Sequence, residues 1–302
     1  MTQTSSLYWL HTLSPLHVGN GEGVGVIDMP IMREKVTEWP LIPGSSMKGV
    51  QRDFYKTQWR NEAWLKEAFG TGGDQDANAG ALVMTDGRIL AFPVASRYGT
   101  FAYVTCPLVL RRLRRDTEAA GQDLEKIKLE GLQEFANQID TGVQSWVTKT
   151  SVIISDASKN VAEVYLDEFA ASSRKEERFD TWAANIGKLL FDSEDEQKIW
   201  QERVVLVSDD AFQYFVTMCC EVTPRIRILT ETKTVDNGAL WNEEYVPTEA
   251  LFYGLIWCDQ RNSSAKVNLL FELKASSILQ IGGNATVGKG RVRCKIDAGG
   301  TI

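Results

Sequence analysis

The sequence predicts an α+β fold, in which separate strands and helices pack around one core. Some segments carry apolar residues at helical spacing, as Met47, Val50 and Phe54 do. Other segments run apolar or alternate with polar residues, as RVRCKI does at 291–296, which is typical of strands. The chain has 302 residues, 43% of them hydrophobic, which is enough for a sizeable core, and we expect one domain over residues 1–302.

In the first half of the chain, a strand is expected in LYWLHTLSPL, which ends at Pro15. A helix is expected to begin at Ser45 or Ser46, and a second helical pattern ends near Gly70, which suits a helix C-cap. Residues 80–105 are rich in Thr, Phe and Val, as strands are.

The second half continues this mixture. Two helical stretches are expected, at 116–138 with interrupting glycines and at 176–202 with many charges. Strands are expected at 204–207 and over much of 213–229, and Asp236-Asn237-Gly238 predicts a hairpin turn. The remaining predicted strands are 251–258, 266–273 and 291–296.

Composition excludes several classes of protein. The longest apolar run, at 251–258, is too short to span a bilayer, and the N-terminus has no basic region of a secretory signal, so we expect a cytoplasmic protein without membrane contact. The five cysteines include no CxxC pair and are expected to be reduced thiols, not a disulfide or zinc site. Two histidines without an HExxH motif leave no histidine-based metal cage.

The net charge of −7 argues mildly against a nucleic-acid partner, but the basic residues are clustered. The clusters are Arg33/Lys35, Lys48/Arg52, Arg111 to Arg115, Arg225/Arg227 and Lys289/Arg291/Arg293/Lys295. An acidic protein can still bind RNA along such stripes. For Arg111 to Arg115 a solvated face, a phosphate contact and a subunit contact all remain open.

The span from His11 to Asp53 holds most of the candidate site. Its glycines alternate with other residues, at Gly19, Gly21, Gly23 and Gly25. This pattern predicts a loop that lets a partner approach the backbone, although a plain mobile loop is the alternative. Asp28 follows as a lone carboxylate, and a lone Asp is more often a turn or cap residue than a catalyst.

A basic helix start comes next. Ser45 and Ser46 stand at the expected N-cap, and Lys48 and Arg52 are four residues apart, so they share one helix face. Positive charge near the positive end of the helix dipole costs roughly a few tenths of a kcal/mol, which a bound anion would relieve. We therefore expect an anion site here, although caps and exposed basic residues are also ordinary features of helices.

A second glycine-rich stretch, from Gly283 to Lys289, nearly matches a P-loop. Gly290 stands where Ser or Thr is required, and a strand pattern follows where a helix is required, so an ATPase is excluded. The glycines at 19–25 likewise fail the dinucleotide-binding pattern, because no glycine falls at its sixth position.

Taken together, these motifs resemble the RAMP superfamily of CRISPR proteins. In the first span they are HxxxGxG, VIDxPIxRE and PLIPGSSxKGxxRD. Further similar segments are GALVMTDGRILAFPV at 80–94, GTFAYVTCPLVLRRLRRD at 99–116, RIRILTETKTVDNGALWNEEYVP at 225–247 and IGGNATVGKGRVR at 281–293. Within the superfamily the chain is similar to the repeated backbone subunit of type III-B (Cmr) effector complexes, and residues 117–203 carry little of the likeness.

The resemblance implies a ferredoxin-like (RRM-type) palm with insertions, a mainly helical insertion at 117–203 and a protruding β-hairpin thumb at 225–250. It assigns the cleavage of RNA to Asp28, His17, Glu243, Glu244 and Tyr245, with Asp28 at the position of the required acid. It assigns contacts with guide RNA to Ser45, Ser46, Lys48, Arg52, Gly288, Lys289 and Arg291.

From this resemblance we expect a subunit that polymerises with further copies along guide CRISPR RNA and cuts complementary target RNA at regular intervals. A divalent metal, Mg²⁺ or Mn²⁺, is expected as cofactor, and Asp28 would be either its ligand or a general base. The other expected partners are the polymerase-like large subunit, the small subunit and the capping RAMP subunits of a Cmr complex. The alternatives are a non-catalytic RNA-binding filament subunit and a guide-processing endoribonuclease.

Overall fold

The computed structural model describes residues 5–21, 23, 25, 27–58, 62–71, 79–123, 125, 127–139, 142–229, 231–259, 273 and 276–296. Its palm is an antiparallel sheet centred on β1 (Ser5–Thr12), which lies between β12 (Leu251–Cys258) and β14 (Arg291–Ile296). On the far side of β12 lies β4 (Gly87–Ala95), and β13 (Ser277–Gln280) forms the edge beside β14. The order β14-β1-β12-β4 is the ferredoxin-like arrangement, which confirms the predicted palm.

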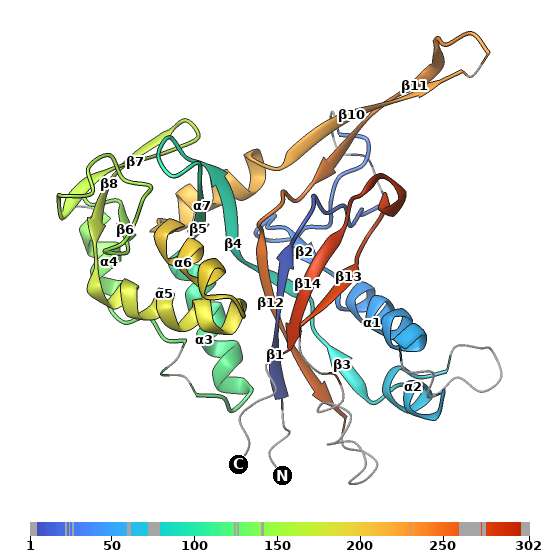
Figure 1. Ribbon diagram of the computed structural model, residues 1–302, viewed down its shortest axis with the longest axis horizontal. Helices are drawn as coiled ribbons and strands as arrows, with labels where there is room; N and C mark the ends of the chain where they lie inside the picture. Colours follow the sequence, from blue (N-terminus) through green and yellow to red (C-terminus); the bar gives the residue numbers. More distant parts are fainter. Residues whose placement is uncertain are drawn as a thin grey trace.

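The first helix, α1 (Gly44–Gln58), connects β1 to β4 and packs on one side of the palm (Figure 1). Met47, Gln51 and Tyr55 recur every four residues and form its buried face. The short strands β2 (Leu41–Ile42) and β3 (Leu82–Met84) flank this helix and join β4 and β12, respectively. α2 (Glu62–Phe69) follows α1 and packs its aromatic residues against Tyr55.

Beyond β4 the sheet continues into an inserted lobe. Its strands are β5 (Phe101–Thr105), β6 (Ser145–Val147), β7 (Val161–Leu166), β8 (Phe169–Lys175) and β9 (Val204–Val207). Its helices are α3 (Pro107–Ala119), α4 (Leu132–Ile139), α5 (Glu177–Leu190) and α6 (Glu194–Arg203). The segment 117–203 thus contains three strands besides its helices. β7 alternates exposed and buried residues, and β8 has small and polar residues (AASSRK) where strands are usually β-branched or aromatic, so its composition gives a weak strand signal.

The chain then enters α7 (Asp209–Met218), so the strand expected over much of 213–229 is wrong for residues 213–218 and correct for residues 221–228. Ser208 caps this helix by accepting the Ala211 N–H at 3.2 Å, and two acidic residues occupy its first turn. This start signal outweighs the aromatic residues that suggested a strand.

The hairpin consists of β10 (Glu221–Ile228) and β11 (Val235–Tyr245), which pair only with each other as ladder strands and project from the palm (Figure 1). Its turn lies at 229–234, where the Leu229 N–H donates to Thr234 O at 2.9 Å. Asp236-Asn237-Gly238 lies inside β11, so the predicted position of the turn was wrong. Pairing of the whole strand outweighs the local preference of an Asn-Gly pair for a turn.

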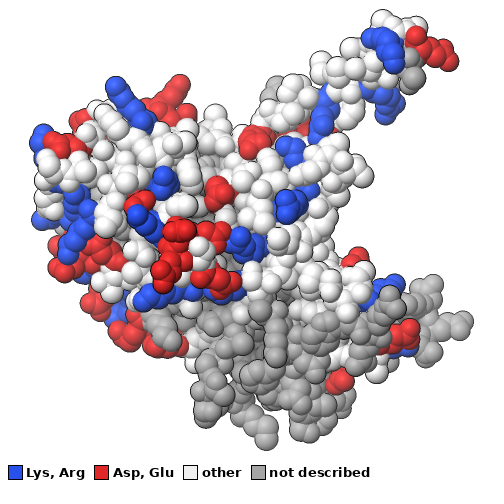
Figure 2. All heavy atoms as spheres, in the orientation of Figure 1, with Lys and Arg blue, Asp and Glu red and all other residues white. Residues whose placement is uncertain are grey.

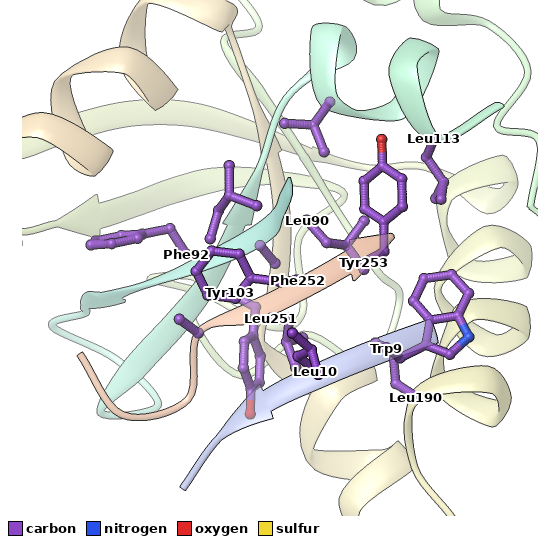
Figure 3. Close-up of a cluster of buried hydrophobic side chains, with 14 of the residues drawn as sticks. Trp9, Leu10, Leu90, Phe92, Tyr103, Leu113, Leu190, Leu251, Phe252 and Tyr253 are labelled. Atoms are coloured by element: carbon purple, nitrogen blue, oxygen red, sulfur yellow. The ribbon is translucent and has the colours of Figure 1, made fainter. Parts of the chain in front are cut away.

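The palm and the inserted lobe share one continuous core. Figure 3 shows Trp9, Phe92, Tyr103 and Tyr253, which come from four strands, in a buried cluster together with leucines of neighbouring elements. Trp9 and Tyr253 lie with ring centroids 6.3 Å apart. No helix in the described part of the chain is long and apolar enough to cross a membrane. The predicted strand at 266–273 lies almost wholly outside the described residues.

Candidate functional site

Three chain segments meet at the root of the hairpin. The last residues of β11 are flanked by the segment after Asp28, because the Met29 N–H donates to Asn242 O at 3.1 Å and the Glu244 N–H donates to Met29 O at 3.0 Å. Directly after β11, Leu16 and Val246 exchange two backbone hydrogen bonds of 2.8 and 2.9 Å. The sequence-distant residues 16–20, 28–32 and 242–246 thus form one small surface.

Asp28 lies exposed on this surface. Its Oδ2 accepts the Asn242 N–H at 2.7 Å, which fixes the carboxylate against the hairpin. Its Oδ1 has no protein partner within the described part of the chain, so one oxygen remains available to a ligand. The carboxylate is therefore both oriented and accessible, as a reactive group must be.

His17, just before the glycine-rich loop, contacts the same strand two residues further along and is only 5% exposed. Its Nδ1 donates to Glu244 O at 2.7 Å, because a carbonyl can only accept. In the neutral ring Nε2 therefore carries a free lone pair. A Cβ at Gly19 would stand 2.8 Å from this Nε2, so the glycine is what allows the loop to pass the ring.

Glu243 is buried at the centre of a hydrogen-bond network. Its Oε2 accepts from Tyr245 OH, from Arg225 Nε at 3.1 Å and from Asn284 Nδ2 at 3.0 Å, and its Oε1 accepts from Trp241 Nε1 at 2.8 Å. Burial alone would raise the pKa of this carboxyl, but these hydrogen bonds outweigh burial and lower its pKa. Glu243 is thus an ionised structural anchor.

Glu244 points to the opposite face of β11, as consecutive strand residues do. Its Oε1 accepts Arg33 Nη2 at 2.5 Å and its Oε2 accepts the Ile31 N–H at 3.0 Å, so both oxygens are engaged. Arg33 also donates to the carbonyls of Glu38 and Val216 at 2.7 and 3.0 Å. Glu244 therefore holds the Asp28 strand against the hairpin root.

The second glycine-rich stretch borders the same surface. The Gly283 N–H donates to His17 O at 2.9 Å, and a Cβ at Gly282 would meet that oxygen at 2.1 Å. Lys289 Nζ lies 4.7 Å from the centroid of the Tyr245 ring, a cation–π contact. Gly288 has φ 79°, which favours glycine, and Arg291 is exposed.

The residues predicted to form an anion site at the start of α1 do not border the Asp28 surface. At the start of α1 the Gly44 N–H is already engaged by the carboxylate of Asp86 at 2.8 Å, so this end carries an acidic partner of its own. Lys48 Nζ donates to Leu82 O at 2.7 Å, and burial lowers its pKa. Ser45 and Arg52 are exposed, and Ser46 is half-buried. The described hydrogen bonds do not join this helix start to the Asp28 surface.

The carboxylate of Asp28 is the side chain of this surface that could bind a metal ion. In the described ranges no cluster of three His, Cys, Asp or Glu residues could hold an ion. The free Oδ1 of Asp28 nevertheless suits a hard cation, since Mg²⁺ is commonly held by one or two carboxylates together with substrate phosphates and water. The residues thus fit a metal that the substrate helps to bind.

Sequence reasoning missed the residues that support this surface. Arg33 was noted only as a basic residue, although it stands in the VIDxPIxRE motif, and Arg225 only as part of a cluster. Asn284 lies in the second glycine-rich stretch but was assigned no role. A buried acid such as Glu243 requires partners, but nothing local indicates which distant residues supply them.

A ferredoxin-like palm, an inserted α/β lobe and a projecting hairpin with a glycine-rich loop at its root define the class of protein. The family model described as the RAMP superfamily matches residues 9–293, and the chain belongs to this superfamily.

The relatives agree with this assignment. The chain is 36% identical over 295 residues, 95% of this chain and 94% of the relative, to the CRISPR system Cmr endoribonuclease Cmr4 of Pyrococcus furiosus. The structure of oligomeric Cmr4 from Pyrococcus furiosus superposes with a TM-score of 0.74 at 31% identity, covering 98% of this chain and 99% of that one. A chain of the type III-B Cmr-beta complex bound to cognate target RNA shares the fold, with a TM-score of 0.71 at 21% identity and 98% coverage of both chains.

Proposed function

We propose that this chain is the repeated backbone subunit of a type III-B CRISPR effector complex and an endoribonuclease that cuts target RNA paired to guide RNA. The observation that carries the proposal is Asp28, an exposed carboxylate with one free oxygen at the hairpin root. The relative named Cmr endoribonuclease Cmr4, similar over nearly the whole chain, supports this activity.

The reaction needs little from the protein, because RNA carries its own nucleophile in the 2′-hydroxyl. Asp28 would accept the proton of that hydroxyl as its oxygen attacks the adjacent phosphorus. The bond between phosphorus and the 5′-oxygen would break, the 5′-oxygen would take up a proton from water, and a 2′,3′-cyclic phosphate would remain. His17 Nε2 is a second proton acceptor on the same loop. A divalent cation, Mg²⁺ or Mn²⁺, bound with Asp28 would neutralise charge that develops on the phosphate.

RNA binding is assigned to exposed or half-exposed cations. Lys289 and Arg291 border the His17 loop, whereas two other cations of that stretch are occupied, Arg293 by Glu196 at 2.7 Å and Lys295 by Asp192 at 2.6 Å. Figure 2 shows basic side chains along the projecting hairpin, with acidic ones at its tip, and basic and acidic side chains intermixed over the lobe. We expect the guide to follow the basic residues near the His17 loop and the hairpin.

The partners follow from this role. Further copies of the chain would pack side by side along one guide, with the large, small and capping subunits of a Cmr complex at the ends and flank. A structure named oligomeric Cmr4 supports self-association. The free cysteines suit a reducing cytoplasm, where guide and target RNA also occur.

The test is Asp28→Ala in an assembled complex, assayed with labelled target RNA with and without Mg²⁺ or Mn²⁺. We expect cleavage to be abolished while guide binding is unchanged and the free energy of unfolding falls by less than about 1 kcal/mol, because the side chain is exposed. Asp53→Ala, an exposed acid on α1, is the control. Undiminished cutting by an all-mutant complex would favour the non-catalytic filament, and cutting of precursor RNA without a guide would favour guide processing.

A further inference from the structure

Three polar side chains from three segments, two of them buried and one half-buried, meet beside the turn that follows the hairpin. His11 is the second-last residue of β1, Tyr103 lies in β5 and Glu249 lies in the turn between β11 and β12. His11 Nε2 is 2.8 Å from Glu249 Oε2, and Tyr103 OH donates to the same oxygen at 2.6 Å. Nothing in the proposed chemistry uses this cluster.

The cluster is costly to maintain. Glu249 has φ 75°, in the left-handed region that non-glycine residues rarely adopt. His11 is 7% exposed, and its Nδ1 is buried without a hydrogen-bond partner. Glycine would be unstrained at position 249, and an apolar residue would leave no orphaned nitrogen at position 11, so stability alone does not explain this choice of residues.

The backbone around Glu249 is tied to the end of β1. Its N–H donates to Thr12 O at 2.8 Å. The hydroxyl of Thr12 donates to Pro247 O at 2.8 Å and accepts the Ala250 N–H at 2.8 Å. The turn 246–250 is therefore joined to β1 by both main-chain and side-chain contacts.

The two chain segments that leave this junction carry the proposed site. One runs from Thr12 to His17, and the other runs back along β11 from Val246 to Asn242. They meet again where Leu16 pairs with Val246 and where His17 Nδ1 donates to Glu244 O. The placement of His17 and of the Asn242 N–H that holds Asp28 thus depends on the junction.

The inserted lobe covers the cluster. Phe191 lies edge-on to His11 with ring centroids 5.4 Å apart, and Trp200 lies 5.3 Å from Tyr103. The neighbouring Arg293–Glu196 ion pair, 2.7 Å long, comes from β14 and α6. Tyr103 therefore connects the lobe to the turn through a single carboxylate.

We infer that Glu249, held by His11 and Tyr103, is a positioning residue that fixes the hairpin root, and with it His17 and Asp28, relative to the palm and the inserted lobe. The inference rests on the proposed cleavage activity for its functional consequence. Its structural consequence, a fixed segment 242–250, is independent of that activity.

The experiment compares Glu249→Gln and Tyr103→Phe with Tyr253→Phe. Tyr253 OH donates to Asp116 Oδ2 at 3.3 Å, so the control also removes a buried tyrosine–carboxylate hydrogen bond, but one that does not touch the turn. Each variant is measured for single-turnover cleavage at saturating target RNA, guide affinity, melting temperature and amide hydrogen exchange in residues 241–250.

We expect Glu249→Gln and Tyr103→Phe to slow cleavage about 10-fold, because small displacements of reacting groups are costly. Guide affinity should stay within about 2-fold, since this cluster does not face the proposed RNA contacts. Exchange in 241–250 should accelerate. Tyr253→Phe should lower the melting temperature to a similar degree but should neither slow cleavage nor accelerate exchange in 241–250. The double variant Glu249→Gln/Tyr103→Phe should cleave no more slowly than the slower single variant, because both substitutions remove the hydrogen bond between Tyr103 and Glu249.

Unchanged cleavage and exchange in both variants would overturn the inference, as would equal slowing by Tyr253→Phe. If the wild-type complex does not cut RNA, the proposed function fails. Faster exchange in 241–250 of the two variants alone would then still support the positioning role, and unchanged exchange would reject it.

Discussion

Asp28 and His17 are both held by main-chain atoms of β11, the Asn242 N–H and the Glu244 carbonyl. Backbone groups are fixed by the strand ladder, so they orient side chains without the rotamer freedom of a side-chain partner. The buried acids Glu243 and Glu244 act one step away, because they secure the strand itself. Substituting them would be expected to alter the geometry of the site and the stability together.

Gly19 supplies the first prediction. A Cβ there would stand 2.8 Å from His17 Nε2, so Gly19→Ala should displace the imidazole and slow target cleavage, while the overall fold persists. Gly49→Ala is the matched control, since a Cβ at that α1 position meets nothing within 4 Å. The helix should tolerate it or gain up to about 1 kcal/mol. Equal cleavage rates for the two variants, measured in assembled complexes, would show that His17 does not contribute.

Among the elements, the hairpin has two different faces. Val222, Ile226, Ile228 and Leu240 form an exposed apolar face, with Leu240 64% exposed. The opposite face carries Arg225 and Trp241, whose contacts with Glu243 anchor the root. A two-stranded hairpin is marginal in water, so its apolar face indicates a partner in the assembled state.

We expect that partner to be the guide–target duplex, where the hairpin would displace a nucleotide and bend the backbone toward Asp28 of a neighbouring copy. Replacing residues 226–240 with a short Gly-Asn turn between the cross-strand partners Arg225 and Trp241 should retain guide binding and the melting temperature of the free subunit. Cleavage should fall sharply. Shortening the exposed turn at 156–159 is the control. A trimmed protein that still cuts at the same evenly spaced sites would contradict this role.

The start of α1 supports a prediction about salt. If Lys48 and Arg52 both contact phosphates, changing both to Ala should weaken guide binding for every sequence and reduce the slope of log affinity against log salt by about 0.7 per contact. Because Lys48 Nζ donates a hydrogen bond to Leu82 O, the single variant Arg52→Ala should account for the larger part of the change in slope. Lys56→Ala, in the last turn of the helix, is the control. An unchanged slope in the double variant would exclude this helix end from RNA binding.

At the level of the whole molecule, acidic and basic regions neutralise one another where the lobe meets the palm. Arg293 and Lys295 of β14 pair with Glu196 and Asp192, which begin or precede α6. The palm face on this side is therefore covered by protein, and other basic side chains lie near the His17 loop and along the hairpin (Figure 2). A negative net charge is compatible with RNA binding for this reason.

Two buried or half-buried carboxyls should control acid stability. The pKa of Glu243 is lowered, as described above, and so is that of Glu249, where hydrogen bonds from His11 and Tyr103 outweigh burial. A carboxyl whose pKa is lower in the folded state than in the unfolded state stabilises the folded protein. This stabilisation is complete above the unfolded-state pKa of about 4.3 and is lost as the pH falls through the folded-state pKa. Urea unfolding from pH 7 to 3 should therefore show wild type losing its advantage over Glu243→Gln at acid pH. A difference that persists at pH 3 would contradict this, and Glu194→Gln is the exposed control.

Local patterns in the sequence predicted much of the fold and the reactive groups. The palm strands, α1 and the hairpin follow from periodicity, caps and family motifs, and Asp28 and His17 stand within those motifs. Of the inserted lobe, β5 and β9 were predicted, whereas β6, β7 and β8 were not, and neither were α7 nor the true position of the hairpin turn. There, pairing across the sheet and a capped helix start outweighed the local composition.

The supporting contacts depend on residues that only folding brings together. Glu243 finds a partner in Asn284, Glu244 finds Arg33 more than two hundred residues earlier in the chain, and His11 meets Glu249 across a similar separation. Helical or strand periodicity reports which face of an element is buried, but not which distant side chain lies opposite a buried charge. Packing of the lobe on the palm selects those partners, because each buried polar group must be satisfied where it comes to lie.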